Sequence, residues 1–171
     1  MSDRIESKVE ELLHQIICRK PPVPVDRIAK KMGILLRDLP GDHDISGAII
    51  RKDAHVVIAV NPAHHLNRKR FTVAHELGHY FFHEGLEEHV DQNFRVAWRN
   101  ADSSRAINWI EVEANRFAAN LLMPTRFLQA DLDSLDTLNA RTLIRLAQRY
   151  VVSTEAMKIR LSQFGITGPF V

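Results

Sequence analysis

The segment FTVAHELGHYFFH, residues 71–83, constrains the fold of this chain more than any other stretch. It places His75 and His79 four residues apart, with Glu76 between them. In an α-helix, side chains four residues apart lie about 40° from each other around the axis, so both imidazoles would project from one face. Apolar residues recur at helical spacing, at Val73, Leu77 and Phe81. The pattern predicts a buried helix over about residues 68–83, with two imidazoles directed at one point.

Two neutral imidazoles on one helix face suit a zinc ion, which binds such nitrogens at about 2.0–2.1 Å. A catalytic zinc normally takes three protein ligands and keeps a further position for water. Glu76 lies next to the histidine face, where its carboxylate could act as general base toward a metal-bound water and then as acid toward a leaving amine. The sequence therefore predicts His75 and His79 as zinc ligands and Glu76 as the catalytic residue of peptide-bond hydrolysis.

The third protein ligand must come from elsewhere in the chain. The extended pattern HExxHxxGxxH is excluded, because Phe82 and Gly85 occupy its later positions. A second helix is expected over about residues 108–123, and it carries Glu111 and Glu113 near its start. Side chains two positions apart on a helix point about 200° from each other, so only one of these carboxylates can face the metal. Helix geometry alone leaves both candidates open.

The remaining elements point to a mostly helical α+β domain. Helices are expected over about residues 5–17, 26–31, 140–150 and 154–164, and residues 86–106 have the polar, aperiodic character of a loop. The segments SGAIIR and HVVIAVN, residues 46–51 and 55–61, favour a β-hairpin. We therefore expect one domain over residues 1–171 with a small antiparallel sheet. If SGAII were an edge strand, it could hold an extended substrate by backbone pairing.

Composition narrows the class of protein and its partners. The chain has 45% hydrophobic and 26% charged residues, as soluble globular proteins do, and a net charge of only +2, which does not favour nucleic acid as a partner. No apolar run approaches the length of a membrane span, and the N-terminus does not resemble a signal peptide. The single cysteine, Cys18, is expected to be a buried thiol on a helix face. A cytoplasmic location, without membrane contact, is the expectation.

Several segments together resemble the ImmA/IrrE family of zinc metallopeptidases. They are RKRFTVAHELGHYFFH at 68–83, EANRFAANLLMP at 113–124, ISGAII and IAVNP before them, PVDRIAKKMGI near the start and LAQRYVVSTEAMKIRL near the end. The resemblance implies a gluzincin-like core in which His75, His79 and Glu113 bind Zn²⁺ and Glu76 is catalytic. It also implies a cytoplasmic endopeptidase whose protein substrate is a transcriptional repressor, often one encoded nearby.

Two other functions compete with this interpretation. Residues 140–165 resemble a helix-turn-helix, which would fit a DNA-binding regulator that uses the zinc site as a sensor without turnover. Its second helix, however, has only Lys158 and Arg160 as basic residues, and Met157 and Leu161 are expected in the core, so packing is favoured. A purely structural zinc site would have no use for Glu76.

Tyr80 and His83 follow the motif on the same predicted helix. Either side chain could stabilise an oxyanion, but packing at the helix end explains each equally well. The sequence therefore leaves the oxyanion-stabilising residue open.

Overall fold

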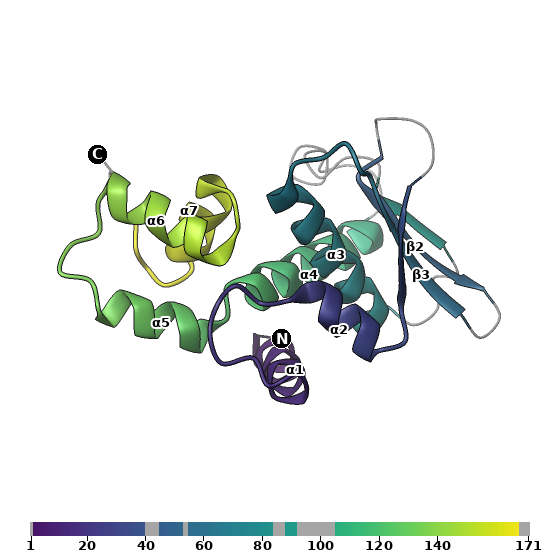
Figure 1. Cartoon of the computed structure of the whole chain (residues 1–171), viewed down its shortest axis with the longest axis horizontal. Coiled ribbons are helices and arrows are strands. Elements are labelled where there is room, and N and C mark those ends of the chain that lie inside the picture. Colours follow the sequence, from purple (N-terminus) through teal and green to yellow (C-terminus); the bar gives the residue numbers. More distant parts are fainter. Residues whose placement is uncertain (1, 40–44, 53–54, 84–87, 92–104, 168–171) are drawn as a thin grey trace. The chain divides into compact units, whose positions relative to one another are not determined.

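The computed structural model describes residues 2–39, 45–52, 55–83, 88–91 and 105–167 (Figure 1). The chain divides into two compact units. The helical unit comprises Met1–Val23 and Ala119–Val171, and the sheet unit comprises Pro24–Ala118. One helix, α4 (Arg105–Leu122), belongs to both, because the unit boundary falls within its last turn.

The helical unit is built from α1 (Ser2–Gln15), the end of α4, α5 (Thr125–Asp133), α6 (Ala140–Tyr150) and α7 (Thr154–Ser162). The helix predicted near the start of the chain buries apolar residues at helical spacing, which are Ile5, Val9, Leu12, Leu13 and Ile16. The bounds of α6 agree with the prediction, and Ser153 caps α7 by accepting a hydrogen bond from the Ala156 amide at 3.0 Å. The expectation for Cys18 is wrong, because α1 ends at Gln15 and the thiol is only partly buried beyond it.

The sheet unit contains α2 (Val25–Lys31), β1 (Leu35–Asp38), β2 (Gly47–Lys52), β3 (His55–Val60), α3 (Leu66–Phe82), β4 (Glu88–Asp91) and most of α4. The sheet order is β1-β3-β2-β4. The predicted hairpin is confirmed, with Gly47 opposite Val60 and Lys52 opposite His55. The expectation of an antiparallel sheet is only partly correct. β1 pairs with β3 in parallel, because β2 runs back against the direction of β1 and the hairpin then returns β3 in that direction, so the sheet is mixed.

The fourth strand corrects two further expectations. β4 lies in the stretch predicted to be a loop, of which residues 92–104 are outside the described part of the chain. It pairs with β2 from Gly47↔Asp91 to Ile50↔Glu88. β2 therefore has a neighbour on each side, so SGAII is an interior strand and cannot accept an added substrate strand. The edges of this sheet are β1 and β4.

Helix α3 packs on the central strands β2 and β3, and α2 packs on α3 and β1. Gly47 lets α3 come close to β2, since a Cβ at that position would collide with the Thr72 methyl carbon. The core of the unit includes Ile49, Ile58 and Leu77, which are fully buried. Among the helices within the described residues, none combines the length and apolarity needed to cross a membrane.

Candidate metal centre

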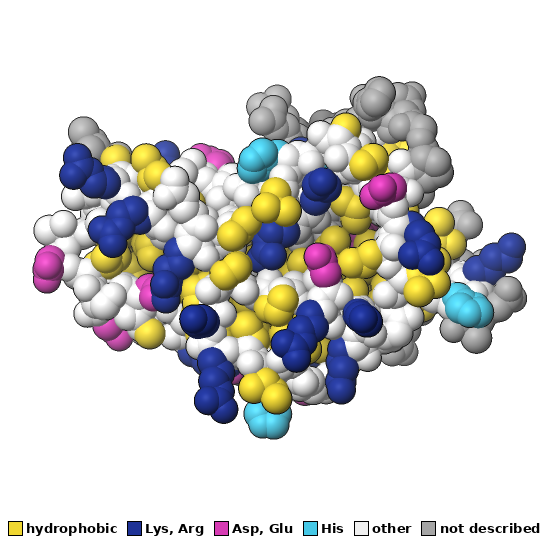
Figure 2. All heavy atoms as spheres, in the orientation of Figure 1, with side chains coloured by type: hydrophobic (Ala, Val, Ile, Leu, Met, Phe, Trp, Pro, Cys, Tyr) yellow, Lys and Arg dark blue, Asp and Glu magenta, His cyan; other side chains and the backbone are white. Residues whose placement is uncertain are grey.

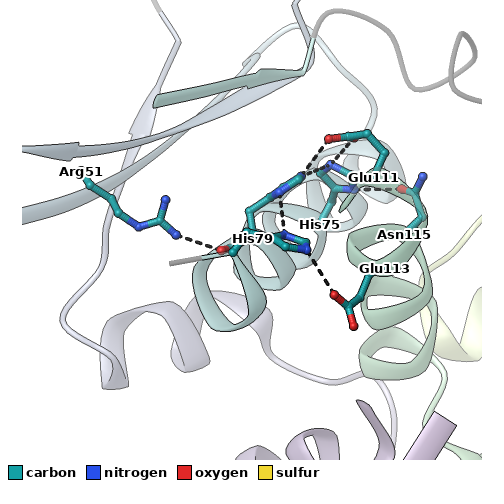
Figure 3. A network of polar contacts seen from close by, with 7 residues as sticks. Arg51, His75, His79, Glu111, Glu113 and Asn115 are labelled. Carbon is teal, nitrogen blue, oxygen red and sulfur yellow. Dashed lines mark hydrogen bonds and ion pairs between the residues drawn. The ribbon is translucent and has the colours of Figure 1, made fainter. Parts of the chain in front are cut away.

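Helix α3 carries the candidate site in the interior of the sheet unit. Residues 72–79 are all buried, with His75 1% exposed and Glu76 and His79 fully buried. The helix begins after His65, whose Nδ1 accepts a hydrogen bond from the Asn67 amide. At its other end, the His79 carbonyl accepts from the His83 amide at 3.1 Å and from Arg51 Nη2 at 2.8 Å (Figure 3). A cation at the carbonyl end of a helix is favourable for the helix dipole.

Helix α4 lies against the same stretch of α3. The two helices come close together at Gly78, where an added Cβ would lie 2.9 Å from Ala114 Cα and 3.3 Å from Ala114 Cβ. Phe117, one turn further along α4, is fully buried and contacts the rings of Phe81 and Phe82 at centroid distances of 5.8 and 5.5 Å. The contact between Gly78 and Ala114 brings the carboxylates of α4 within reach of the histidines of α3.

His75, His79 and Glu111 converge and form a candidate metal-binding group (Figure 3). The two Nε2 atoms are 3.0 Å apart. Glu111 Oε2 is 3.3 Å from His75 Nε2, and Oε1 is 3.4 Å from His79 Nε2. Ligands at about 2.0–2.1 Å from a tetrahedral ion lie about 3.3–3.4 Å from one another. The triangle of two nitrogens and one oxygen therefore has the size and the donor types that suit zinc.

The hydrogen bond made by the His75 ring favours metal binding through its Nε2 atom. Its Nδ1 is 2.8 Å from Asn115 Oδ1. An amide oxygen only accepts hydrogen bonds, so Nδ1 carries the proton and the neutral ring has its electron pair on Nε2. Asn115 follows Glu111 by four residues, so both side chains project from the same face of α4. One helix face supplies a candidate ligand and the residue that orients another ligand.

Glu113 is not placed where the resemblance led us to expect it. Its Oε2 lies 3.2 Å from His83 Nε2, and Glu111 occupies the position beside His75 and His79. The physical reason is the separation of about 200° between the two side chains on α4, which directs them to different neighbours. The geometry therefore favours Glu111 as third ligand in place of Glu113. Both residues were candidates from the sequence, which does not tell how α4 is rotated about its axis relative to α3.

The other predicted residues of α3 also have defined surroundings. Glu76 is enclosed beside His75, and its catalytic role stays a prediction. His83 Nδ1 lies 3.1 Å from His79 Nδ1, on the edge of that ring away from the candidate metal position. The Tyr80 ring contacts the Phe81 ring at a centroid distance of 5.0 Å. Asn115 is a site residue that was not predicted from the sequence, although its spacing from Glu111 was available as a signal.

Comparison with known proteins gives two findings and one negative result. The peptidase family described as the IrrE N-terminal-like domain matches residues 29–162, which is most of the chain. A solved structure of a Mycobacterium tuberculosis transcriptional regulator has a similar fold, with a TM-score of 0.63 at 17% sequence identity. The similarity covers 93% of this chain and 46% of that one, so the chain spans about half the length of its structural relative. No curated protein matches the sequence.

Proposed function

Since the chain belongs to the IrrE N-terminal-like peptidase family, we propose that it is a zinc-dependent endopeptidase that cleaves one specific protein, a transcriptional repressor. The observation that carries the zinc assignment is the convergence of His75, His79 and Glu111, whose ligand atoms all lie within 4.8 Å of one another. With a glutamate from α4 as third ligand, the core would be of the gluzincin type. We place the protein in the cytoplasm, where such a repressor would be found.

The donor set favours a catalytic use over a structural one. Structural zinc sites are normally closed by four protein ligands, whereas catalytic sites have three and keep a position open. The group found among the described residues has three members, two neutral nitrogens and one carboxylate. A zinc ion bound there would supply Lewis acidity toward water and toward the peptide carbonyl.

The remaining chemistry belongs to residues of this chain. His75 and His79 present Nε2 from one face of α3, and Glu111 brings its carboxylate from α4. Glu76 would take a proton from the attacking water at a carboxylate oxygen and then deliver it to the amine that leaves the cleaved bond. Its burial shields this carboxylate from bulk water, which strengthens its electrostatic interactions with the reacting groups.

The repressor substrate is supported by the resemblance of the sequence segments to ImmA/IrrE proteins. A repressor encoded beside this chain would be the first substrate to test. In the recombinant full chain with zinc added, we expect cleavage of that repressor at a defined position, observed by electrophoresis and intact mass. The same incubation with unrelated unfolded proteins separates a specific endopeptidase from a general one.

Substitutions of Glu76 and Glu111 distinguish the proposed general base from the proposed metal ligand, because the two changes should affect zinc binding differently. Glu76→Gln should bind zinc as the wild type does and lose cleavage, because the amide cannot accept the proton. Glu111→Gln should lose stoichiometric zinc as well as cleavage, because a neutral amide oxygen replaces a carboxylate ligand. Asp38→Asn removes the same charge from an exposed position on β1 and serves as the control. Undiminished cleavage by Glu76→Gln would reject the mechanism, and full zinc content in Glu111→Gln would reject the ligand set.

A second candidate is a DNA-binding regulator that senses zinc, favoured by the description of the structural relative as a transcriptional regulator and by the helix pair α6 and α7. Within α7, Arg160 is only 5% exposed and donates to Met123 O, so of the two basic residues Lys158 alone is exposed. Met157 and Leu161 are fully buried. Figure 2 shows basic side chains distributed over the visible face with apolar ones between them.

These features make α7 a poor reader of DNA bases, so the regulator stays the second candidate. Helix α6 does present a row of exposed arginines, Arg141, Arg145 and Arg149, that could contact phosphates. DNA retention by the full chain, measured with and without zinc and combined with no cleavage of any repressor, would favour it.

A further inference from the structure

Three imidazoles follow one another along α3 and into its C-terminal cap, at His75, His79 and His83. The second and third are joined through their Nδ1 atoms at 3.1 Å. The third is joined to a carboxylate of α4, with His83 Nε2 3.2 Å from Glu113 Oε2. A continuous path of polar contacts therefore runs from Glu113 through His83 to the edge of His79 that faces away from the candidate metal position (Figure 3).

For a neutral His83, the chemistry of the groups sets the direction of each hydrogen bond. A carboxylate only accepts, so His83 donates from Nε2 to Glu113. A neutral imidazole that donates from Nε2 accepts at Nδ1, so the bond between the rings is donated by His79 Nδ1. His79 then has its electron pair on Nε2, the atom that lies 3.0 Å from His75 Nε2 and 3.4 Å from Glu111. The path thus selects the tautomer that a metal requires.

We propose that Glu113 and His83 are positioning residues that hold His79 as a metal ligand. They fix its ring orientation and keep the proton on Nδ1, as Asn115 does more directly for His75. Outer hydrogen bonds of this kind orient metal-binding histidines and raise their basicity. This inference rests on the metal site of the proposed function. It assigns a role to Glu113, which is not part of the group formed by His75, His79 and Glu111.

The surroundings make these contacts effective. The side chains of His83 and Glu113 are 8% and 18% exposed, so bulk water competes weakly for either bond. α4 contributes to the site in three ways: Glu111 joins the ligand triangle, Asn115 orients His75, and Glu113 acts on His79 through His83. A shift of α4 relative to α3 would therefore disturb all three at once.

A first experiment tests the path without metal. In the full chain with ¹⁵N-labelled histidine and no metal, the bond between His79 and His83 should give a scalar coupling between the two Nδ1 nuclei across the hydrogen bond. His83→Phe keeps a ring of similar size, lacks the acceptor and should abolish the coupling. Absence of the coupling in folded wild type overturns the inference. Because no metal is present, this result is independent of whether the chain binds zinc or cleaves a protein.

A second experiment measures zinc affinity by competition with a chromophoric chelator. We expect His83→Phe and Glu113→Ala to raise the Kd for zinc by about 10–100-fold. Glu113→Gln retains an acceptor oxygen and should bind zinc more tightly than Glu113→Ala. The control Asp38→Asn should bind as the wild type does.

The variants separate the possible explanations. Wild-type affinity in both Glu113→Ala and His83→Phe overturns the inference. Equal weakening by Glu113→Gln and Glu113→Ala also overturns it, because charge alone would then explain the effect. Should His83→Phe fail to fold by circular dichroism, the two Glu113 variants and the wild-type coupling still decide. A wild type that shows the coupling and binds no zinc refutes the proposed function and leaves the hydrogen-bond path standing.

Discussion

The contact between α3 and α4 at Gly78 predicts a specific defect for Gly78→Ala. The new Cβ would lie 2.9 Å from Ala114 Cα, whereas ordinary contacts begin at 3.4 Å. The obstacle is backbone, which cannot turn aside as a flexible side chain can. The helices must therefore separate by about 0.5 Å, while metal sites tolerate only about 0.2 Å in their ligand distances. Glu111 lies one turn before Ala114, so it would move away from the histidines.

The expected magnitudes differ between the metal-free and the zinc-bound protein. Without metal, alanine gains about 0.8–1.0 kcal/mol of helix propensity over glycine. Overpacking costs about 1–3 kcal/mol, so the free energy of unfolding should fall by about 0–2 kcal/mol. Zinc affinity should fall by about 10-fold or more, comparable to the loss of outer support around a ligand. Each tenfold weakening lowers the stabilisation by zinc by about 1.4 kcal/mol, or about 3–6 °C in Tm for a chain of this length.

The assay is thermal unfolding followed by circular dichroism, at one fixed zinc concentration and with a chelator. The quantity compared is the rise in Tm produced by zinc. Ala114→Gly is the matched control, because it weakens the helix without forcing the two backbones apart, and its zinc-induced rise should persist. A Gly78→Ala protein that melts above the wild type without metal and keeps the full rise with zinc would show that the helices do not approach as closely as described.

Further predictions concern the helical unit and the whole chain. Arg160→Met should lower the free energy of unfolding by about 2–4 kcal/mol in urea titrations, because it removes a buried guanidinium that donates hydrogen bonds to Met123 O, Asn120 Oδ1 and Thr125 Oγ1. The exposed control Lys158→Met should change this free energy by less than about 0.5 kcal/mol. Burial, and then the nearby Asp131 carboxylate, raises the pKa of Tyr150 above its ordinary value, so the unfolded chain ionises first above about pH 10. Stability should then fall by up to about 1.4 kcal/mol per pH unit, and Tyr150→Phe should remove that contribution, which stability measurements at pH 9–11 can check. If residues 1–171 form one domain, Trp fluorescence and far-UV circular dichroism should report a single coincident unfolding transition; two separate transitions would contradict this.

The parts of the fold that the sequence predicted are those with strong local patterns. Repeating apolar positions located α1 and α3, and enrichment in β-branched residues located the hairpin of β2 and β3. Helix α5 was not predicted, because its nine residues follow Pro124 and bury only Phe127 and Leu128, too few to set a clear period. Nor was β4, a four-residue strand whose sequence EHVD has little β-propensity. β4 is paired to β2 along its length, so tertiary pairing rather than local preference determines it.

The choice between Glu111 and Glu113 depends on a quantity that a sequence does not contain. Both residues lie near the start of α4, and a rotation of the helix by half a turn would exchange their surroundings. In the structure that rotation is determined by contacts of α4 with residues far away in the sequence. Phe117 contacts the rings of Phe81 and Phe82 at the end of α3, and Ala114 faces Gly78. With those residues directed at α3, Glu111 and Asn115 fall on the side of the histidine pair and Glu113 falls toward His83. The packing of apolar and small residues thus determines which carboxylate can bind a metal, and zinc retention by Glu113→Gln together with zinc loss by Glu111→Gln is the result that this packing requires.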